Sequence, residues 1–200
     1  IDWLENDPSM YDLGNFVLEQ ALWDSKLFLQ QNPDFFINVN VSAKQLERPD
    51  FCRVVLELLD KTEFPVRHLC LEITERCRSL PVSVINERMA VLRGYGIKFA
   101  MDDFGTGSSS SAMALEMLID EIKIDMSFIR KILVNKKNKA IVQSMVDFAN
   151  AANIKSCLEG VENKALEDYL RTVGATWFQG YYYSKPVGAD ELEILLSAKK

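Results

Sequence analysis

Short apolar runs alternate along the chain with longer segments in which apolar residues recur every three or four positions. The short runs predict strands and the longer segments predict amphipathic helices. The predicted strands cover residues 35–42, 69–75, 97–103, 121–125, 154–161 and 176–182. Strands separated by helical segments are typical of βα units and a parallel sheet. No linker or low-complexity segment interrupts residues 1–200, so the pattern predicts a single α/β domain.

Three helical segments have the clearest apolar stripes. The first is marked by Leu13, Val17, Ala21 and Leu22, the second by Val84, Ile85, Met89 and Leu92, and the third by Ile141, Met145, Phe148, Ala149 and Ala152. Gly94 and Gly96 follow the second stripe, as expected where a helix ends. Each stripe predicts the face that its helix turns toward the core.

Alternation within the strands separates an apolar face from a face that becomes polar toward the end of each strand. Neighbouring side chains of a strand point to opposite faces, so Leu71 opposes Glu72 and Ile122 opposes Lys123. An open sheet covered by helices on both sides is apolar on both faces. A parallel barrel with a polar mouth fits the pattern better, and barrel enzymes place their chemistry at that mouth.

The composition limits which binding partners and which cellular compartment we expect for this protein. The 200 residues are 48% hydrophobic and carry a net charge of −6, which argues against a nucleic-acid polymer held by bulk positive charge. The chain contains no apolar run long enough for a membrane span. Its four cysteines form no CxxC pair and indicate free thiols in a reducing, cytoplasmic setting.

Polar residues stand at or just beyond the ends of all six predicted strands. They are Asn40, Glu72, Glu75, Asp102, Asp103, Lys123, Asp125, Glu159, Glu162 and Gln179. Carboxylates gathered at one mouth repel one another unless cations neutralise them. Carboxylate and amide oxygens suit Mg²⁺ or Mn²⁺. His68 is the single histidine, which disfavours a histidine-based zinc site or a Ser-His-Asp triad.

The adjacent Asp102 and Asp103 suggest two neighbouring metal positions, because successive strand side chains diverge. Two metals about 3.5 to 4 Å apart can clamp a phosphodiester. Lys123 then either holds the attacking water or is a salt-bridged lysine of the barrel interior. Glu159 is either a ligand or base, or the partner of Lys123. The glycine- and serine-rich segment 105–111 lacks the ending of a P-loop and is better explained as a mobile lid or interface loop.

Six ordered motifs resemble the EAL domain, a bacterial module that opens cyclic di-GMP to linear pGpG. They are NVNVSAKQL at 38–46, LEITE at 71–75, MDDFGTG at 101–107, IKID at 122–125, LEGVE at 158–162 and QGYYYSKP at 179–186. The resemblance implies a (β/α)8 TIM-barrel variant and a requirement for two Mg²⁺ or Mn²⁺ ions. It also implies a cytoplasmic bacterial signalling enzyme that forms a homodimer and accompanies further domains such as GGDEF.

The resemblance also assigns roles to the polar residues. It implies metal ligation by Asn40, Glu72, Asp102 and Asp103, orientation of the catalytic water by Lys123, and acid or base chemistry by Glu159. Glu162, Gln179 and Asp125 are implied on the substrate side, where Gln179 also supports the metal and water network. Glu75 is implied to anchor the loop that begins with Asp102.

The chain departs from the family pattern at two places. Ser108 stands where the family usually has tyrosine, and the glutamate-alanine-leucine signature is missing together with a metal-ligating glutamate and a phosphate-contacting arginine. We therefore expect a truncated barrel that lacks its first strand and helix and is inactive as a fragment. The alternative is a degenerate EAL domain that binds cyclic di-GMP or a protein without hydrolysis. A metal-dependent barrel enzyme with another substrate is a third interpretation.

Overall fold

The computed structural model describes residues 7, 9–74, 80–107 and 110–197, the last range without the side chains of 110 and 111. The chain divides into two compact units, Ile1–Phe99 with Val187–Lys200, and Ala100–Pro186. In the described residues, helices and strands alternate, and the strands pair in parallel within each unit. This arrangement confirms the predicted α/β class.

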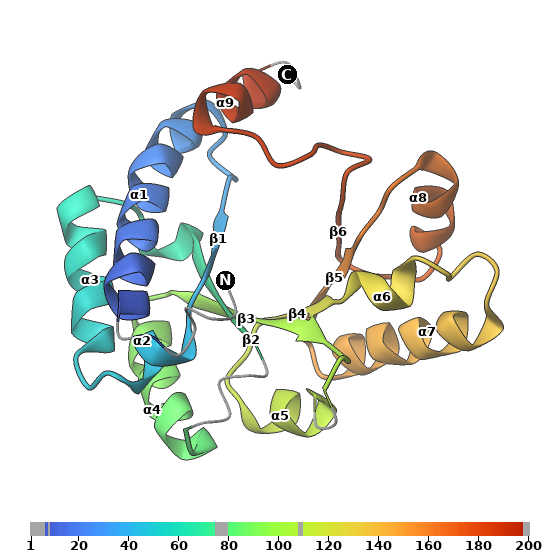
Figure 1. Cartoon of the computed structure of the whole chain (residues 1–200), viewed down its shortest axis with the longest axis horizontal. Coiled ribbons are helices and arrows are strands. Elements are labelled where there is room, and N and C mark those ends of the chain that lie inside the picture. Colours follow the sequence, from blue (N-terminus) through green and yellow to red (C-terminus); the bar gives the residue numbers. More distant parts are fainter. Residues whose placement is uncertain (1–6, 8, 75–79, 108–109, 198–200) are drawn as a thin grey trace. The chain divides into compact units, whose positions relative to one another are not determined.

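In its described residues, the first unit contains two parallel strands and most of the long helices (Figure 1). Its elements are α1 (Ser9–Gln31), β1 (Ile37–Asn40), α2 (Ala43–Glu47), α3 (Phe51–Thr62), a 3-10 turn (Val66–His68), β2 (Leu69–Thr74), α4 (Val82–Gly94) and α9 (Ala189–Ser197). The register of β1 and β2 places Asn38 beside Cys70 and Asn40 beside Glu72. The two strand ends therefore present polar residues at the same level.

Where the structure describes it, the second unit contains four parallel strands paired in chain order, with helices between them (Figure 1). Its elements are β3 (Lys98–Phe104, which begins at the unit boundary), α5 (Ser110–Glu116), β4 (Glu121–Ile124), α6 (Met126–Ile129), α7 (Lys136–Ala151), β5 (Lys155–Glu159), α8 (Lys164–Leu170) and β6 (Trp177–Gln179). The predicted strands are present but mostly shorter, above all the first and the last. Glu75 and Ser108 lie outside the described residues.

Helix α1 buries a different face from the one predicted. Leu18 and Leu22 are 1% and 0% exposed, whereas Leu13 and Val17 are 42% and 47% exposed. The helix carries apolar residues on both sides, so periodicity alone does not select the core-facing side. Only Leu22 of the predicted stripe belongs to the buried face, which also includes Gly14 and Ser25.

The other two helical stripes differ in outcome. Helix α4 buries Ile85, Met89 and Leu92 as predicted. Helix α7 buries Ala149 of its predicted stripe, together with Val142 and Val146 from outside that stripe, while Ile141 is 42% exposed. Met145 and Phe148 line a shallow apolar groove with Phe104, and the Phe104 and Phe148 rings stack with centroids 6.2 Å apart.

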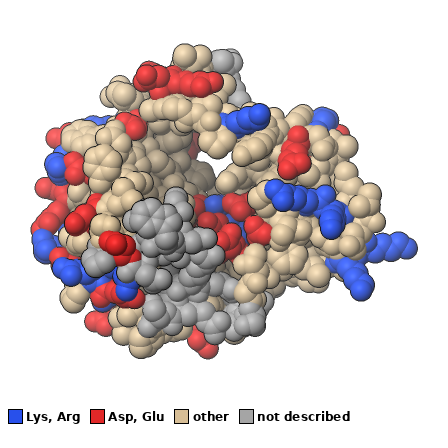
Figure 2. Space-filling model, in the orientation of Figure 1, with Lys and Arg blue, Asp and Glu red and all other residues tan. Residues whose placement is uncertain are grey.

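The surface carries charges of both signs. On the face drawn in Figure 2, acidic and basic side chains both occur, with basic ones at the left edge as well as at the right edge. Among the described residues, no helix combines the length and the apolar character that crossing a membrane requires. Cys70 and Cys157 are buried and Cys52 is half-buried, and none of these three described cysteines forms a disulfide.

The buried face of α1 gives a direct test of the packing. We expect Leu18→Ala to lower the free energy of unfolding by about 2–5 kcal/mol, because it removes buried methyl groups and leaves a cavity. The matched change Leu13→Ala, on the exposed face, should alter it by no more than about 0.5 kcal/mol. Urea unfolding of both variants measures the difference, and equal effects would contradict this assignment of the core.

Candidate metal centre

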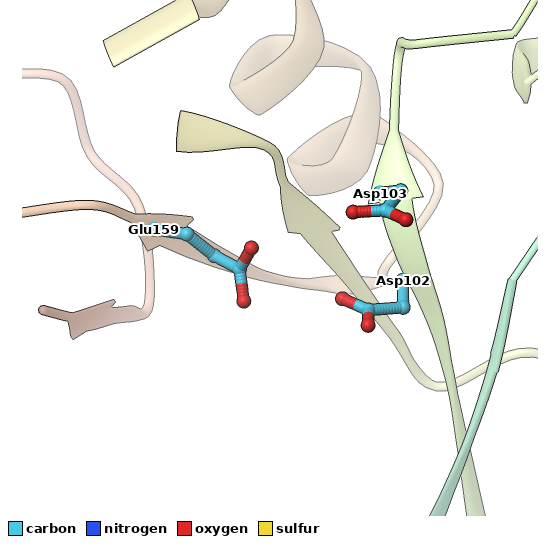
Figure 3. A group of neighbouring side chains, drawn as sticks. All are labelled: Asp102, Asp103 and Glu159. Atoms are coloured by element: carbon cyan, nitrogen blue, oxygen red, sulfur yellow. The ribbon is translucent and has the colours of Figure 1, made fainter. Parts of the chain in front are cut away.

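Three carboxylates of the second unit gather where β3 and β5 end. Asp102, Asp103 and Glu159 each offer an oxygen, and these oxygens all lie within 4.8 Å of one another. Figure 3 shows the Asp102 and Asp103 side chains on β3 and the Glu159 side chain on β5 turned toward a common space. All three residues are half-buried. The group therefore remains open to a small ligand.

A β-bulge explains how two successive residues reach the same space. In the pairing of β3 with β4, Met101 lies beside Ile122 and Phe104 beside Ile124, so β3 contains one more residue than its partner over this step. Asp103 has a φ of 53°, in the left-handed region that aspartate tolerates better than most residues. A regular strand would send the two side chains to opposite faces, whereas the bulge redirects one of them. The expected divergence of Asp102 and Asp103 is therefore replaced by convergence toward Glu159.

Lys123 lies on β4, between the two strands that carry the carboxylates. Its Nζ is 3.1 Å from Asp102 Oδ1 and 2.9 Å from Glu159 Oε1, and the residue is 5% exposed. A buried ammonium is stabilised only where such partners offset the loss of its hydration. The structure thus contains the ion pairs that are expected if Lys123 is a salt-bridged lysine. Lys123 balances part of the negative charge of the three carboxylates.

The first unit brings together a second set of polar side chains. Glu72 is 4% exposed and accepts a hydrogen bond of 2.8 Å from Asn38 Nδ2. Asn40, its neighbour in register on β1, is exposed. The sequence reasoning missed Asn38, although it shares strand parity with Asn40. Asn38 Oδ1 is buried without a hydrogen-bond partner among the described residues, so this amide has an acceptor to spare beside Glu72.

The remaining candidates occupy less constrained positions. Gln179 pairs in register with Glu159 on the neighbouring strand, and Glu162 is exposed in the loop after β5. Asp125 accepts a 2.9 Å hydrogen bond from the Ser127 backbone N–H and caps α6. Its side chain therefore has a structural task in addition to the predicted substrate contact.

The donor chemistry of the second unit fits a hard divalent cation. The side chains that form this group offer only oxygen atoms: Asp102, Asp103 and Glu159. Mg²⁺ and Mn²⁺ prefer oxygen ligands to softer ligands such as thiolate sulfur. Three carboxylates against one ammonium leave the group negative, which further favours a cation. The class defined by this fold and site is thus an α/β domain with a group of carboxylates at strand ends whose oxygen donors suit a cation.

Comparison with known proteins identifies the family within that class. The family model of the EAL domain matches residues 2–186, and the chain belongs to this family. It is 36% identical over 170 residues to the probable cyclic di-GMP phosphodiesterase PdeG of Escherichia coli, covering 83% of this chain and 33% of that protein. It is 31% identical over 175 residues to the cyclic di-GMP phosphodiesterase PdeA of Borreliella burgdorferi, covering 88% of this chain and 26% of that protein.

A solved structure extends the likeness to the fold. The EAL enzyme Bd1971 in its cAMP- and cyclic-di-GMP-bound form matches with a TM-score of 0.94 and 32% identity, covering 98% of this chain and 54% of that one. The resemblance inferred from the six motifs is therefore confirmed at the level of family and fold. The chain spans about a third or less of the length of the two curated relatives.

The buried ammonium yields a prediction about cation dependence. Lys123→Met should lower the free energy of unfolding by about 3–5 kcal/mol in EDTA, because it removes the buried ammonium that balances the half-buried carboxylates. Millimolar Mg²⁺ or Mn²⁺ should recover part of this loss by binding the folded state. Thermal unfolding with and without the cation measures both effects.

The matched control is Lys61→Met, which removes a lysine whose side chain is 58% exposed and pairs with Glu19. We expect little change in stability and no recovery by the cation for this variant. A Lys123→Met protein whose unfolding ignores both cations would contradict the assignment of a cation site.

Proposed function

We propose that this chain is the catalytic domain of a metal-dependent phosphodiesterase that hydrolyses cyclic di-GMP to linear pGpG. One observation carries the proposal: Asp102, Asp103 and Glu159 converge around Lys123 in a member of the EAL family. Relatives of that family named as cyclic di-GMP phosphodiesterases support the choice of substrate. The hydrolysis is proposed for a longer protein that contains this chain, whereas the chain alone is expected to be inactive.

The residues divide into those that would hold cations and those that would act on water. Asp102 and Asp103 would bind two Mg²⁺ or Mn²⁺ ions together with Asn40 and Glu72, and the bound ions would supply charge neutralisation of the phosphodiester and a more acidic water. The proposal requires the ligands of the first unit to join those of the second.

Hydrolysis needs a proton acceptor for the attacking water and a group that keeps this water in line. The water oxygen forms a bond to phosphorus, the bond from phosphorus to the 3′ oxygen breaks, and that oxygen leaves with a proton as a hydroxyl. Glu159 takes the proton of the water in this scheme and gives it to the 3′ oxygen as that oxygen leaves. Lys123, 2.9 Å from Glu159 Oε1, orients the water and stabilises charge on the phosphoryl oxygens.

Substrate recognition is assigned to residues at the rim. Glu162 is exposed and available to a guanine edge, and Gln179 lies beside Glu159 in register. Asp125 would contact the substrate, and Glu75 would anchor the loop that begins with Asp102. The proposed protein would also form a homodimer and carry further domains such as GGDEF. These assignments follow the family resemblance.

The alternative is a receptor that binds cyclic di-GMP without hydrolysis. The ion pairs of Lys123 favour it in one respect, since they balance part of the site's charge without any cation. A domain of this kind would keep ligand affinity and release no pGpG. Turnover, rather than binding, separates the two functions.

Substitution of Glu159 tests the proposed chemistry in the longest protein that contains this chain. Glu159→Gln should retain cyclic di-GMP binding and lose about 10²- to 10⁴-fold in turnover, as expected when a positioned acid or base is removed. Release of pGpG, followed by chromatography at saturating Mg²⁺ or Mn²⁺, measures the rate, and calorimetry measures binding. A wild-type protein that binds cyclic di-GMP but releases no pGpG would establish the receptor instead.

A second substitution separates the cation from the proton transfer. Asp103→Asn should weaken Mn²⁺ binding by about tenfold or more, because it removes a charged oxygen ligand from the group. Its turnover should rise again as Mn²⁺ is increased, whereas that of Glu159→Gln should stay low. Identical Mn²⁺ titrations of wild type and Asp103→Asn would refute metal ligation by this residue.

A further inference from the structure

Glu167 is a buried carboxylate that the proposed chemistry does not use. It lies on α8 and is 5% exposed. Its Oε1 accepts two hydrogen bonds from Arg171, one of 3.0 Å from Nε and one of 2.6 Å from Nη2. Lys164 Nζ lies 3.2 Å from the other oxygen. The Arg171 guanidinium, ahead of the Lys164 ammonium, holds the pKa of Glu167 below its usual value. The side chain is therefore a charged acceptor at neutral pH.

The same carboxylate reaches the segment that follows β6. The Tyr183 hydroxyl donates a hydrogen bond of 3.2 Å to Glu167 Oε1, and the Arg171 guanidinium lies 5.6 Å from the centre of the Phe178 ring. Burial, followed by the neighbouring Glu167 charge, raises the pKa of Tyr183. Glu167 on α8 and Arg171, the residue after α8, thus contact the turn after β6 and β6 itself.

That turn is also fixed to the loop after β5 through the backbone. The Val161 N–H donates to the Gln179 carbonyl at 3.0 Å, and the Tyr182 N–H donates to the Val161 carbonyl at 3.0 Å. A Cβ at Gly180 would lie 2.2 Å from the Val161 carbonyl oxygen, so only glycine allows this approach. The turn that follows Gln179 and the loop that carries Glu162 are therefore joined through their backbones.

We infer that Glu167 and Tyr183 act as positioning residues that hold these two loops in place for the ligand. The inference rests on the proposed function, because it assigns Gln179 and Glu162 to the cyclic di-GMP site. Arg171 and Lys164 already offset the charge of Glu167, so the carboxylate does not require Tyr183 for its own stability. Tyr183 is 37% exposed, and water alone would satisfy its hydroxyl. The contact constrains the turn after β6 rather than the helix.

Three substitutions isolate the hydroxyl contact. Tyr183→Phe removes the donor and keeps the ring, and Glu167→Leu removes the acceptor and both ion pairs. Glu167→Gln retains an oxygen that accepts from Tyr183 and serves as the conservative variant. Asp168→Asn is the matched control, since it breaks the exposed ion pair of Lys164 with Asp168 on the same helix without touching either loop.

Hydrogen exchange of the ligand-free protein tests the contact independently of any activity. The amides of Val161 and Tyr182 should exchange about 3- to 10-fold faster in Tyr183→Phe and Glu167→Leu, the range expected for losing one hydrogen bond. Exchange in Glu167→Gln should stay closer to the wild-type rate, and Asp168→Asn should match wild type. Unchanged exchange in both Tyr183→Phe and Glu167→Leu would overturn the inference.

Steady-state kinetics then separates positioning from general stability. Tyr183→Phe should raise KM, or Kd where there is no turnover, by about 3- to 10-fold, with less than about a twofold change in kcat. A fall in kcat with an unaltered KM, or an effect no larger than that of Asp168→Asn, would also overturn the inference. A wild-type protein that neither binds nor hydrolyses cyclic di-GMP would refute the proposed function, and the exchange rates would still decide whether Glu167 and Tyr183 hold the loops.

Discussion

The ammonium of Lys123, buried between carboxylates, is the interaction on which the candidate site depends. Acidic side chains at the ends of neighbouring strands repel one another most strongly where water is excluded. Because β4 lies between β3 and β5, one lysine on it contacts Asp102 on one side and Glu159 on the other. The order of the strands thus makes the acidic group compatible with a folded chain, while its remaining negative charge favours a divalent cation.

The bulge in β3 determines which oxygens belong to that group. The extra residue between Met101 and Phe104, with the positive φ of Asp103, brings two successive carboxylates to the same side. Buried Phe104 follows immediately and stacks on Phe148 of α7, so the irregular turn is bounded by core packing. Local backbone strain of this kind persists where the surrounding structure holds it in place. The packed Phe104 ring and the bulge at Asp103 together fix the geometry of the site.

Polar contacts outside the acidic group extend the same principle of orientation. In the first unit, the Asn38 amide holds one oxygen of Glu72 and leaves its own carbonyl oxygen buried beside it. In the second, Glu167 connects α8 to the turn after β6, while backbone hydrogen bonds join that turn to the loop after β5. Side chains that bind a cation or a ligand need such partners, because a freely rotating carboxylate or amide loses entropy on binding.

The sequence by itself determined the α/β class, the family and the polar residues at the strand ends. Alternation in the strands and six ordered motifs were sufficient, because both are local patterns. Candidates such as Asp102, Lys123 and Glu159 followed from strand parity. The resemblance to the family then supplied roles that parity alone left open, and those of Asp125, Glu162 and Gln179 still rest on it.

Only the tertiary structure decided how these residues meet. Parity assumes a regular strand, so it could not reveal that a bulge turns Asp103 toward Glu159. Periodicity could not choose between the two apolar sides of α1, because the choice depends on which side finds a packing partner. The contacts of Asn38 with Glu72 and of Tyr183 with Glu167 join distant segments, and no local pattern encodes them. These contacts form through long-range packing, which the local patterns of a single sequence do not reveal.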